Sequence, residues 1–418
     1  MFVYVCYMLM AGIYYIKAIF RMFTRNFMKI QNKILSVVAL SVFSHSIFAI
    51  PFTFEGRSLG MGGVSVATAD LATAAWANPA MLTNQRPGDD FSLLVGVGAF
   101  VRDDDDLISD IDDFQAADVR RTAAANAGNI EDEVAALVDM VAVINRIDNK
   151  DMAVDVSGVA AVGMAFKKFA MALSVRADVI GAGTVTDLSQ NILEVTDPTK
   201  NTLNLEGVIA TEFGLSLAKK FRFHGREVSL GIKPKIVDLQ AFIYRESILN
   251  TNSLGDVFDN GKKFDLGTFT SFDVGAAVEL TDSVRLGLNI RNLLTGEFDL
   301  GGTKLNFDTN ARIGVAYHNR MMTLAVDYDL TANKPLLANP VFDDLKTQYL
   351  AVGAEFNAFS FAQLRVGARK NVASGISSGA RDTALTAGVG FWLGFNLDVA
   401  ATFTNNSVGG FVQTGFRF

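Results

Sequence analysis

The chain has 418 residues, of which half are hydrophobic, and it contains 36 glycines, 33 phenylalanines and only 7 prolines. This composition indicates many strands with few breaks rather than an ordinary soluble core. Its formal net charge is −7, and after residue 50 no apolar run reaches the roughly 18 residues that a transmembrane helix needs.

Two hydrophobic stretches lie at the N-terminus, from Phe2 to Phe20 and from Ile34 to Ala49. The second follows a basic start and ends on a small residue, which is the pattern of a secretory signal peptide. Residues 1–49 are therefore predicted to be a leader whose last part is this signal peptide. Two explanations remain open for residues 1–27. They are an extension of the gene model, with Met28 as the true start, or an inner-membrane anchor.

Removal of this leader takes away five basic and no acidic residues, which leaves 32 basic and 44 acidic residues and a formal charge of −12. Nucleic acid is therefore excluded as a partner, because phosphate binding needs a concentrated positive surface. The single cysteine, Cys6, lies in the leader as well. A mature chain without thiols excludes disulfide scaffolds, thiol redox chemistry and cysteine zinc sites.

Residues 50–90 form a glycine-rich segment that contains an Asn-Pro-Ala motif at 78–80. Glycines allow positive φ and close approach of two backbones. A proline holds the preceding asparagine extended, so the amide of Asn78 is free to bond neighbouring backbone. By itself the segment also fits a turn-rich linker. Its notable residues are Gly60, Gly62, Gly63, Asp70, Asn78, Pro79 and Ala80.

From Phe91 onward, apolar residues recur at every second position, which predicts about fourteen strands. The predicted strands are 91–101, 154–164, 169–179, 205–217, 228–236, 272–280, 284–290, 311–317, 322–328, 350–356, 362–368, 385–393, 395–403 and 412–418. Residues 91–418 therefore constitute one all-β domain.

Short and long connections alternate between these strands. The short links are centred on Lys167, Thr281, His318, Asn357 and Gly394. The long ones are 102–150, 182–202, 248–267, 293–307, 331–346 and 371–381. Transmembrane barrels have tight turns at one end and long extracellular loops at the other. In lipid such a sheet has to close, because an open edge leaves backbone groups without partners. The prediction is a transmembrane antiparallel β-barrel.

The longest connection, residues 103–150, is predicted to be a partly helical extracellular loop. It starts with a run of aspartates from Asp103 to Asp113 and continues into a helix capped by Asn129, with one apolar stripe. The aspartates are interpreted as a solvated acidic loop, since a calcium loop would also need the glycine and terminal glutamate of an EF-hand. A loop of this length could cover the barrel mouth.

Charged residues alternate with apolar ones in the predicted strands. Each Arg or Lys would cost about 2 to 4 kcal/mol if it faced lipid at mid-membrane, so these side chains are predicted to face the lumen. They are Arg176, Asp178, Glu212, Lys233, Lys235, Asp273, Arg285, Arg312, Asp327, Arg365 and Arg369. Two interpretations remain: a network of paired charges that stabilises the wall, or a substrate path.

The last segment alternates up to an aromatic terminus, with Phe416 and Phe418 on one face. It resembles the C-terminal signal that directs bacterial β-barrels into the outer membrane. The expected location is the outer membrane of a Gram-negative bacterium. The expected partners are its lipid and lipopolysaccharide, and the barrel assembly machinery.

The glycine-rich segment followed by a barrel resembles the FadL family of outer-membrane transporters of hydrophobic compounds. In that family the segment is a hatch inside a fourteen-stranded barrel. The resemblance implies that Gly60, Gly62, Gly63, Asp70 and the 78–80 motif are hatch residues. The opening 51–63 is similar to barrel proteins called conjugal transfer TraF-like. That label also covers thioredoxin-like proteins, whose cysteines this chain lacks.

Enzymatic activity is not expected. Gly375, Ser377 and Gly379 match a nucleophile pattern, but that pattern needs a strand-to-helix turn and a histidine partner. The histidines of the mature chain, His224 and His318, are predicted at the opposite end of the barrel. No cofactor or metal motif is present. The predicted function is passive uptake of a small hydrophobic ligand through a plugged lumen. The alternative is a non-transporting component of a conjugal transfer or cell-surface apparatus.

Overall fold

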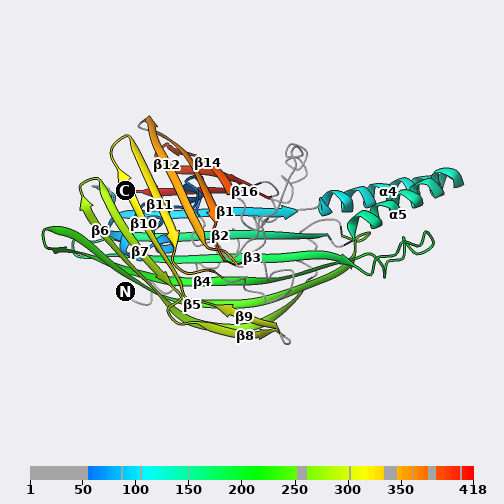
Figure 1. Cartoon of the computed structure of the whole chain (residues 1–418), viewed down its shortest axis with the longest axis horizontal. Helices are drawn as coiled ribbons and strands as arrows, with labels where there is room; N and C mark the ends of the chain where they lie inside the picture. The colour runs from blue at the N-terminus through cyan, green and yellow to red at the C-terminus, as the bar shows by residue number, and fades with distance from the viewer. Residues whose placement is uncertain are drawn as a thin grey trace, which may run out of the picture.

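Fourteen antiparallel strands form a closed barrel in the computed structural model (Figure 1). The structure describes residues 55–418 except 86–87, 104–105, 149, 252–260, 301–302, 334–345, 360, 375–382 and 405–406. The barrel strands are β1 (Phe91–Asp103), β2 (Asp151–Ala165), β3 (Ala170–Thr186), β4 (Thr202–Phe223), β5 (Arg226–Ser247), β6 (Lys262–Thr281), β7 (Val284–Arg291), β10 (Asn310–His318), β11 (Met322–Asp329), β12 (Tyr349–Phe359), β13 (Ala362–Asn371), β14 (Thr383–Trp392), β15 (Asn396–Phe403) and β16 (Ser407–Arg417). The predicted fourteen-stranded barrel is confirmed. The leader and Ser377 lie outside the described residues.

Each barrel strand pairs with the next one along the chain, and β1 pairs with β16 to close the wall. At the seam, the backbone N–H of Phe91 donates to the carbonyl of Phe418 at 2.8 Å, and the N–H of Phe418 donates back at 3.1 Å. The two rings stack with their centroids 4.8 Å apart. The chain end therefore serves as one side of the closing pair.

Alternation along the strands separates an apolar outer face from a polar inner one. On β11, the outward Leu324, Val326 and Tyr328 are each about 40% exposed, whereas the intervening Ala325 and Asp327 are buried. This is the two-residue period of a strand that lies between two different environments. A charged side chain on β11 thus turns away from the apolar exterior.

The wall is much taller on one side than the alternation predicted. Strands β4 and β5 each have 22 residues and β6 has 20, although about 9–11 tilted residues cross a membrane. The predicted boundaries at 217, 228, 236 and 272 were too short. In β5 the apolar residues change faces after Ile236, because Val237, Leu239 and Ala241 are buried inward whereas Asp238 and Gln240 alternate with them. Counting apolar residues on one face therefore stops there, while backbone pairing continues.

Two strands lie outside the barrel. β8 (Gly296–Leu300) and β9 (Thr303–Phe307) pair with each other in the connection between β7 and β10. The long connection predicted over residues 293–307 thus lies between β7 and β10, and it contains a hairpin that the sequence analysis did not predict. β7 and β10 pair directly across this insertion.

A helical hairpin extends from the end of the barrel opposite the chain terminus (Figure 1). It consists of α4 (Leu107–Ala127) and α5 (Ile130–Ile147). Asn129 accepts a hydrogen bond from the N–H of Asp132 at 3.3 Å and so caps α5, as its sequence predicts. Within the described part of the chain, no helix has both the length and the apolar content needed to cross a membrane. We call this end the helical end, and the opposite one, where Phe91 and Phe418 meet, the short-turn end.

The aspartate run was predicted to be a solvated loop. Asp112 and Asp113 are exposed, but the run is helical from Leu107 onward. Much of it lies in α4, where Asp110 is buried and pairs with Arg146 at 2.9 Å and with Lys150 at 2.7 Å. Apolar residues of both helices pack against the tall strands, including Phe242 of β5. Because these contacts join distant segments, alternation and local charge did not reveal them.

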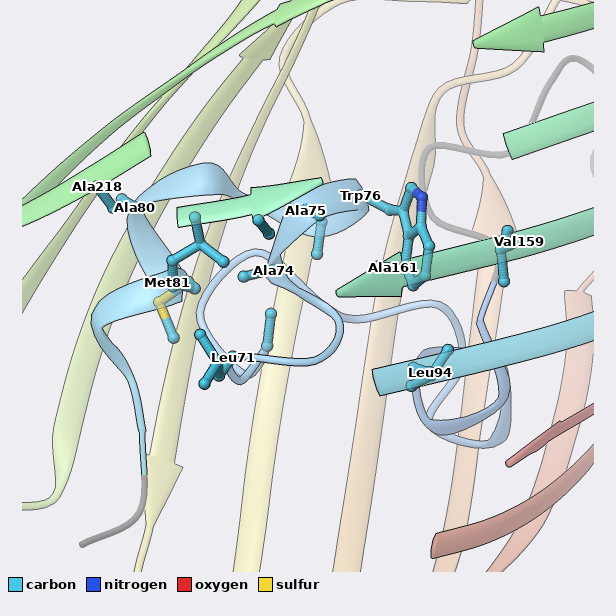
Figure 2. Close-up of a cluster of buried hydrophobic side chains, with 14 of the residues drawn as sticks. Leu71, Ala74, Ala75, Trp76, Ala80, Met81, Leu94, Val159, Ala161 and Ala218 are labelled. Carbon is cyan, nitrogen blue, oxygen red and sulfur yellow. The ribbon is translucent and has the colours of Figure 1, made fainter. Parts of the chain in front are cut away.

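Residues 55–85, which we call the luminal segment, lie inside the barrel. They contain α2 (Gly56–Gly60), α3 (Ala74–Ala77) and the short 3-10 helix η1 (Pro79–Thr83). Figure 2 shows Trp76 of this segment beside Val159 and Ala161 of β2, and Met81 within η1. The main hydrophobic cluster therefore joins the luminal segment to the wall.

We expect Phe418→Ala to lower the free energy of unfolding of the barrel by about 1 to 2 kcal/mol, because it removes a stacked aromatic pair at the closing seam. Urea titration of the barrel in lipid vesicles measures this. Leu393→Ala is the matched control, an outward residue at the same end and of similar exposure. An equal loss in both variants would contradict a special role for the seam.

Candidate functional site

Wall side chains supply hydrogen-bond partners for the backbone of the luminal segment. Asp327 on β11 accepts from the N–H groups of Ser65 at 2.7 Å and Val66 at 3.0 Å. From β10, Arg312 donates to the carbonyl of Gly63 at 3.1 Å. Buried backbone groups need such partners, and here the segment has no strand beside it to provide them. The charges of the wall thus attach the luminal segment.

Asn78 is the central polar residue of the Asn-Pro-Ala motif. Its Nδ2 donates to the carbonyl of Val66 at 2.9 Å and to the carbonyl of Ala276 on β6 at 3.2 Å. Its Oδ1 accepts from the N–H of Ala80 at 3.1 Å, which caps η1 with Pro79 at the first position. One amide side chain therefore joins two turns of the segment to the wall.

Asp70 bonds only to nearby residues of the luminal segment in the described structure. Its Oδ1 accepts from the N–H groups of Ala72 at 3.1 Å and Thr73 at 3.2 Å. It shapes the turn that leads into α3, and it is only partly buried. The structure gives no hydrogen bond from Asp70 to a barrel strand within the described residues.

A buried cluster of charges connects α2 to the strands near the C-terminus. Arg57 binds Glu355 of β12 through two hydrogen bonds of 2.8 Å, one to each carboxylate oxygen. Arg365 of β13 joins the same carboxylate at 2.8 Å and also pairs with Asp398 of β15. Bidentate pairs of this kind are strong and directional. The sequence analysis missed Arg57 and Glu355, because only the fold brings them together.

Glu55 begins α2 and lies beside the same cluster. Its carboxylate accepts from the N–H groups of Ser58 at 2.7 Å and Arg57 at 2.8 Å and thereby caps the helix. Burial raises the pKa of Glu55 to about 7, the Arg57 charge opposing and the Asp398 charge adding to this rise. Glu55 was not among the predicted residues either, although its position just before the glycine-rich run is that of a helix cap.

Glycines allow the luminal segment to lie directly against the wall. Gly62 and Gly63 have φ of +75° and +93°, a region that other residues rarely adopt. Opposite them, a Cβ on Gly353 or Gly367 would collide with the backbone of Met61 or Gly62. The predicted hatch glycines thus lie against glycines of the barrel strands, and the small size of both sets allows the close contact.

The remaining predicted residues that were assigned to the lumen are all buried and most are paired. Lys233 and Lys235 both bind Glu212, and Lys235 also binds Asp273 at 2.8 Å. The other close pairs are Arg176 with Asp178, Arg285 with Glu279, Arg312 with Asp329 and Arg365 with Asp398. Arg369 lies over the ring of Tyr349, 5.1 Å from its centroid. The arrangement is a network of paired charges.

One part of the lumen has buried charges with incomplete bonding. Neither carboxylate oxygen of Asp155 on β2 and neither terminal amino group of Arg176 on β3 has a hydrogen-bond partner among the described residues. Both side chains are only 2% exposed. Polar groups that are buried without a hydrogen bond are costly. Arg176 offsets part of this cost through the ion pair between its Nε and Asp178, at 2.7 Å.

We expect Gly367→Ala to displace the luminal segment, because the added Cβ meets backbone rather than a flexible side chain. The cost of docking should be about 1 to 3 kcal/mol. Protease cleavage within residues 55–85 of the folded barrel reports the displacement. Gly410→Ala is the control, since a Cβ there makes only ordinary contact. Unchanged cleavage in Gly367→Ala would contradict the close fit.

Docking of the luminal segment should also depend on pH through Glu55. Its pKa is raised from 4.5 to about 7 when the segment is docked. The protonated form of Glu55 therefore stabilises docking fully below pH 4.5, and this contribution is lost as the pH rises through 7. We therefore expect faster cleavage of the segment at about pH 8 than at about pH 5. The variant Glu55→Gln should abolish most of this difference. A pH dependence that is unchanged in Glu55→Gln would rule out this residue as the cause.

Solved structures with a similar fold include two toluene transporters and a FadL homologue. The toluene transporter TbuX of Ralstonia pickettii matches with a TM-score of 0.52 and 12% identity, over 88% of this chain and 99% of its own. The toluene transporter TodX of P. putida gives the same values. A FadL homologue of Pseudomonas aeruginosa matches with a TM-score of 0.51 and 11% identity, over 90% of this chain and 99% of its own. The predicted resemblance to FadL-type barrels is confirmed at the level of the fold.

No curated protein matches the chain significantly in sequence. Residues 75–329, more than half of the chain, match the sequence profile of the family described as "F plasmid transfer operon, TraF, protein". The matched region runs from α3 through β11 and so includes the Asn-Pro-Ala motif and the helical hairpin. The chain belongs to this TraF family and has the fold of FadL-type outer-membrane barrels.

Proposed function

We propose that this protein is an outer-membrane barrel that admits small hydrophobic compounds, with residues 50–90 as its hatch and 91–418 as its barrel. The supporting observation is the luminal segment, which contacts strands all around the wall. Its α2 packs on β14 and β15, and η1 packs on β4, β5 and β6. Passage through such a lumen requires movement of the hatch. The glycines Gly60, Gly62 and Gly63 and the 78–80 motif are the proposed hatch residues.

The connections support the proposed membrane placement. The short turns and the end of the chain lie at one end of the barrel, and the helical hairpin lies at the other (Figure 1). An exported chain with an even number of strands leaves both ends in the periplasm, with the long loops outside. The proposed location is the outer membrane of a Gram-negative bacterium, after removal of residues 1–49 as a leader.

The chemistry of the lumen supports a hydrophobic ligand. Trp76, Leu94 and Val159 belong to a buried apolar cluster where the luminal segment meets β1 and β2 (Figure 2). Apolar solutes partition poorly into the lipopolysaccharide layer, so a protein path with apolar patches gives them an entry. Passive diffusion with rearrangement of the hatch is the proposed mechanism, with the paired charges maintaining the shape of the wall.

A second function, in a conjugation or cell-surface apparatus, is favoured by one observation. The helical hairpin exposes Val119, Ile130, Val134 and Val138 to solvent at the outer end. The last three follow one another at intervals of four residues and lie along one stripe of α5. An apolar stripe on a protruding hairpin is a feature of contact surfaces. The family description is consistent with such a role.

Uptake of toluene into cells tests the leading proposal. Deletion of the gene should lower uptake, and Asn78→Ala should raise the leak of small polar solutes and change toluene uptake. That variant removes the side-chain donor to the carbonyls of Val66 and Ala276, and each group left unsatisfied costs about 1 to 3 kcal/mol. Asn145→Ala, whose side chain bonds only within α5, is the control.

Normal uptake of toluene and of long-chain fatty acid in the deletion strain would contradict the transport proposal. If the same strain lost conjugation, the second function would be supported. The two experiments share one strain, so the outcomes can be compared directly.

A further inference from the structure

A group of cations gathers at one arc of the short-turn end. Lys167 and Lys168 form the turn between β2 and β3, and Lys219, Lys220, Arg222 and Arg226 lie in the hairpin of β4 and β5. Ala170 pairs with Ala218, so the register brings the turn next to Lys219 and Lys220. We call these six residues the rim cations. They stand out because the whole chain is acidic, with a net charge of −7.

Most of this positive charge is not neutralised by the protein. Lys220 pairs with Glu227 at 2.9 Å, and Arg222 reaches the same carboxylate only at 3.9 Å. Arg226 donates to a backbone carbonyl, that of Leu280, at 2.9 Å. In the described part of the chain, no carboxylate pairs with Lys167, Lys168 or Lys219. In the described residues, Glu227 is thus the one carboxylate that pairs with rim cations, and it contacts two of the six.

The outer face of β4 shows what surrounds these cations. Phe213, Leu217, Lys219, Phe221 and Phe223 occupy alternate positions and are all exposed. Since alternate residues of a strand share a face, Lys219 belongs to the same outward row as the lipid-facing Phe213 and Leu217. Its Nζ lies 5.1 Å from the ring centroid of Phe221. A lysine can extend its ammonium group past such apolar neighbours to reach a polar layer.

The neighbouring turn repeats this combination of aromatic and basic residues. Phe166 and Phe169 flank Lys167 and Lys168, and their exposed rings stack with centroids 4.8 Å apart. Exposed aromatic side chains at a barrel rim mark the interface between hydrocarbon and headgroups. The rim cations therefore lie at the depth of the phosphate groups.

We propose that the rim cations form a binding site for anionic phospholipid, with phosphatidylglycerol in the inner leaflet of the outer membrane as its ligand. The charges are complementary, and lysine ammonium groups bind phosphate without demanding a fixed geometry. An acidic periplasmic protein would be recognised by a surface that faces the aqueous space. Here Lys219 and Arg226 share their face with rings directed to lipid, and Lys167 and Lys168 lie between two such rings. Lys220 and Arg222 alternate to the other face of β4 and add to the positive charge of the rim. This inference relies on the proposed membrane placement but not on transport.

Native mass spectrometry of the full-length barrel tests it, with phosphatidylglycerol and phosphatidylethanolamine offered in equal amounts in detergent. The wild-type protein should retain phosphatidylglycerol preferentially. The combined variant Lys167→Gln, Lys168→Gln, Lys219→Gln and Lys220→Gln should lower that preference by about tenfold or more, because each basic residue near a membrane surface attracts anionic lipid.

A matched variant controls for total charge. Lys200, Arg245, Lys262 and Lys263 lie at the helical end of β4, β5 and β6, and their change to Gln should leave the preference intact. Heat-dependent migration in gels shows that each variant is folded. Retention of lipid A, which is offered separately, should be equal in wild type and rim variant.

Three outcomes would overturn the proposal. They are no preference for phosphatidylglycerol in the wild type, an equal loss in the rim variant and the control variant, and a rim variant that loses lipid A but keeps phosphatidylglycerol. None of these results depends on whether toluene is taken up, so the failure of this inference can be told apart from failure of the transport proposal.

Discussion

Backbone hydrogen bonding away from water is the constraint on which both the wall and its contents depend. In a lipid-exposed sheet an unpaired edge costs several kcal/mol for each group, so β1 and β16 must meet. The luminal segment faces the same requirement without a strand to pair with. Its N–H and carbonyl groups are bonded by side chains of the wall, such as Asp327 and Arg312.

The same requirement explains why so many charges are inside. A carboxylate that binds two N–H groups, or an arginine that binds a carbonyl, is itself buried and needs a partner of opposite charge. Arg312 has Asp329, and Arg57 has Glu355. The network that stabilises the wall is therefore also the attachment of the luminal segment. A movement of that segment has to exchange these bonds for others.

Particular residues show how far prediction from the sequence could go. The two-residue period identified the barrel, and the cost of exposing charge to lipid placed residues such as Lys233 and Arg365 inside. The Asn-Pro-Ala motif singled out Asn78, whose amide does bond neighbouring backbone. Arg57 and Glu355 were missed because neither residue differs from other charged residues until its partner, 298 positions away, is known. Strand ends and α4 were missed because pairing and packing there continue beyond the apolar pattern.

The sequence by itself determined the class of fold, the number of strands and the inward face of the charges, because alternation is a local property that reports which environment each side chain meets. Only the tertiary structure decided which charges pair, how glycines of the luminal segment oppose glycines of the wall, and that two basic turns form one cluster at the rim. These are contacts between segments far apart in the chain. Their energies depend on distances that become defined only when the barrel closes.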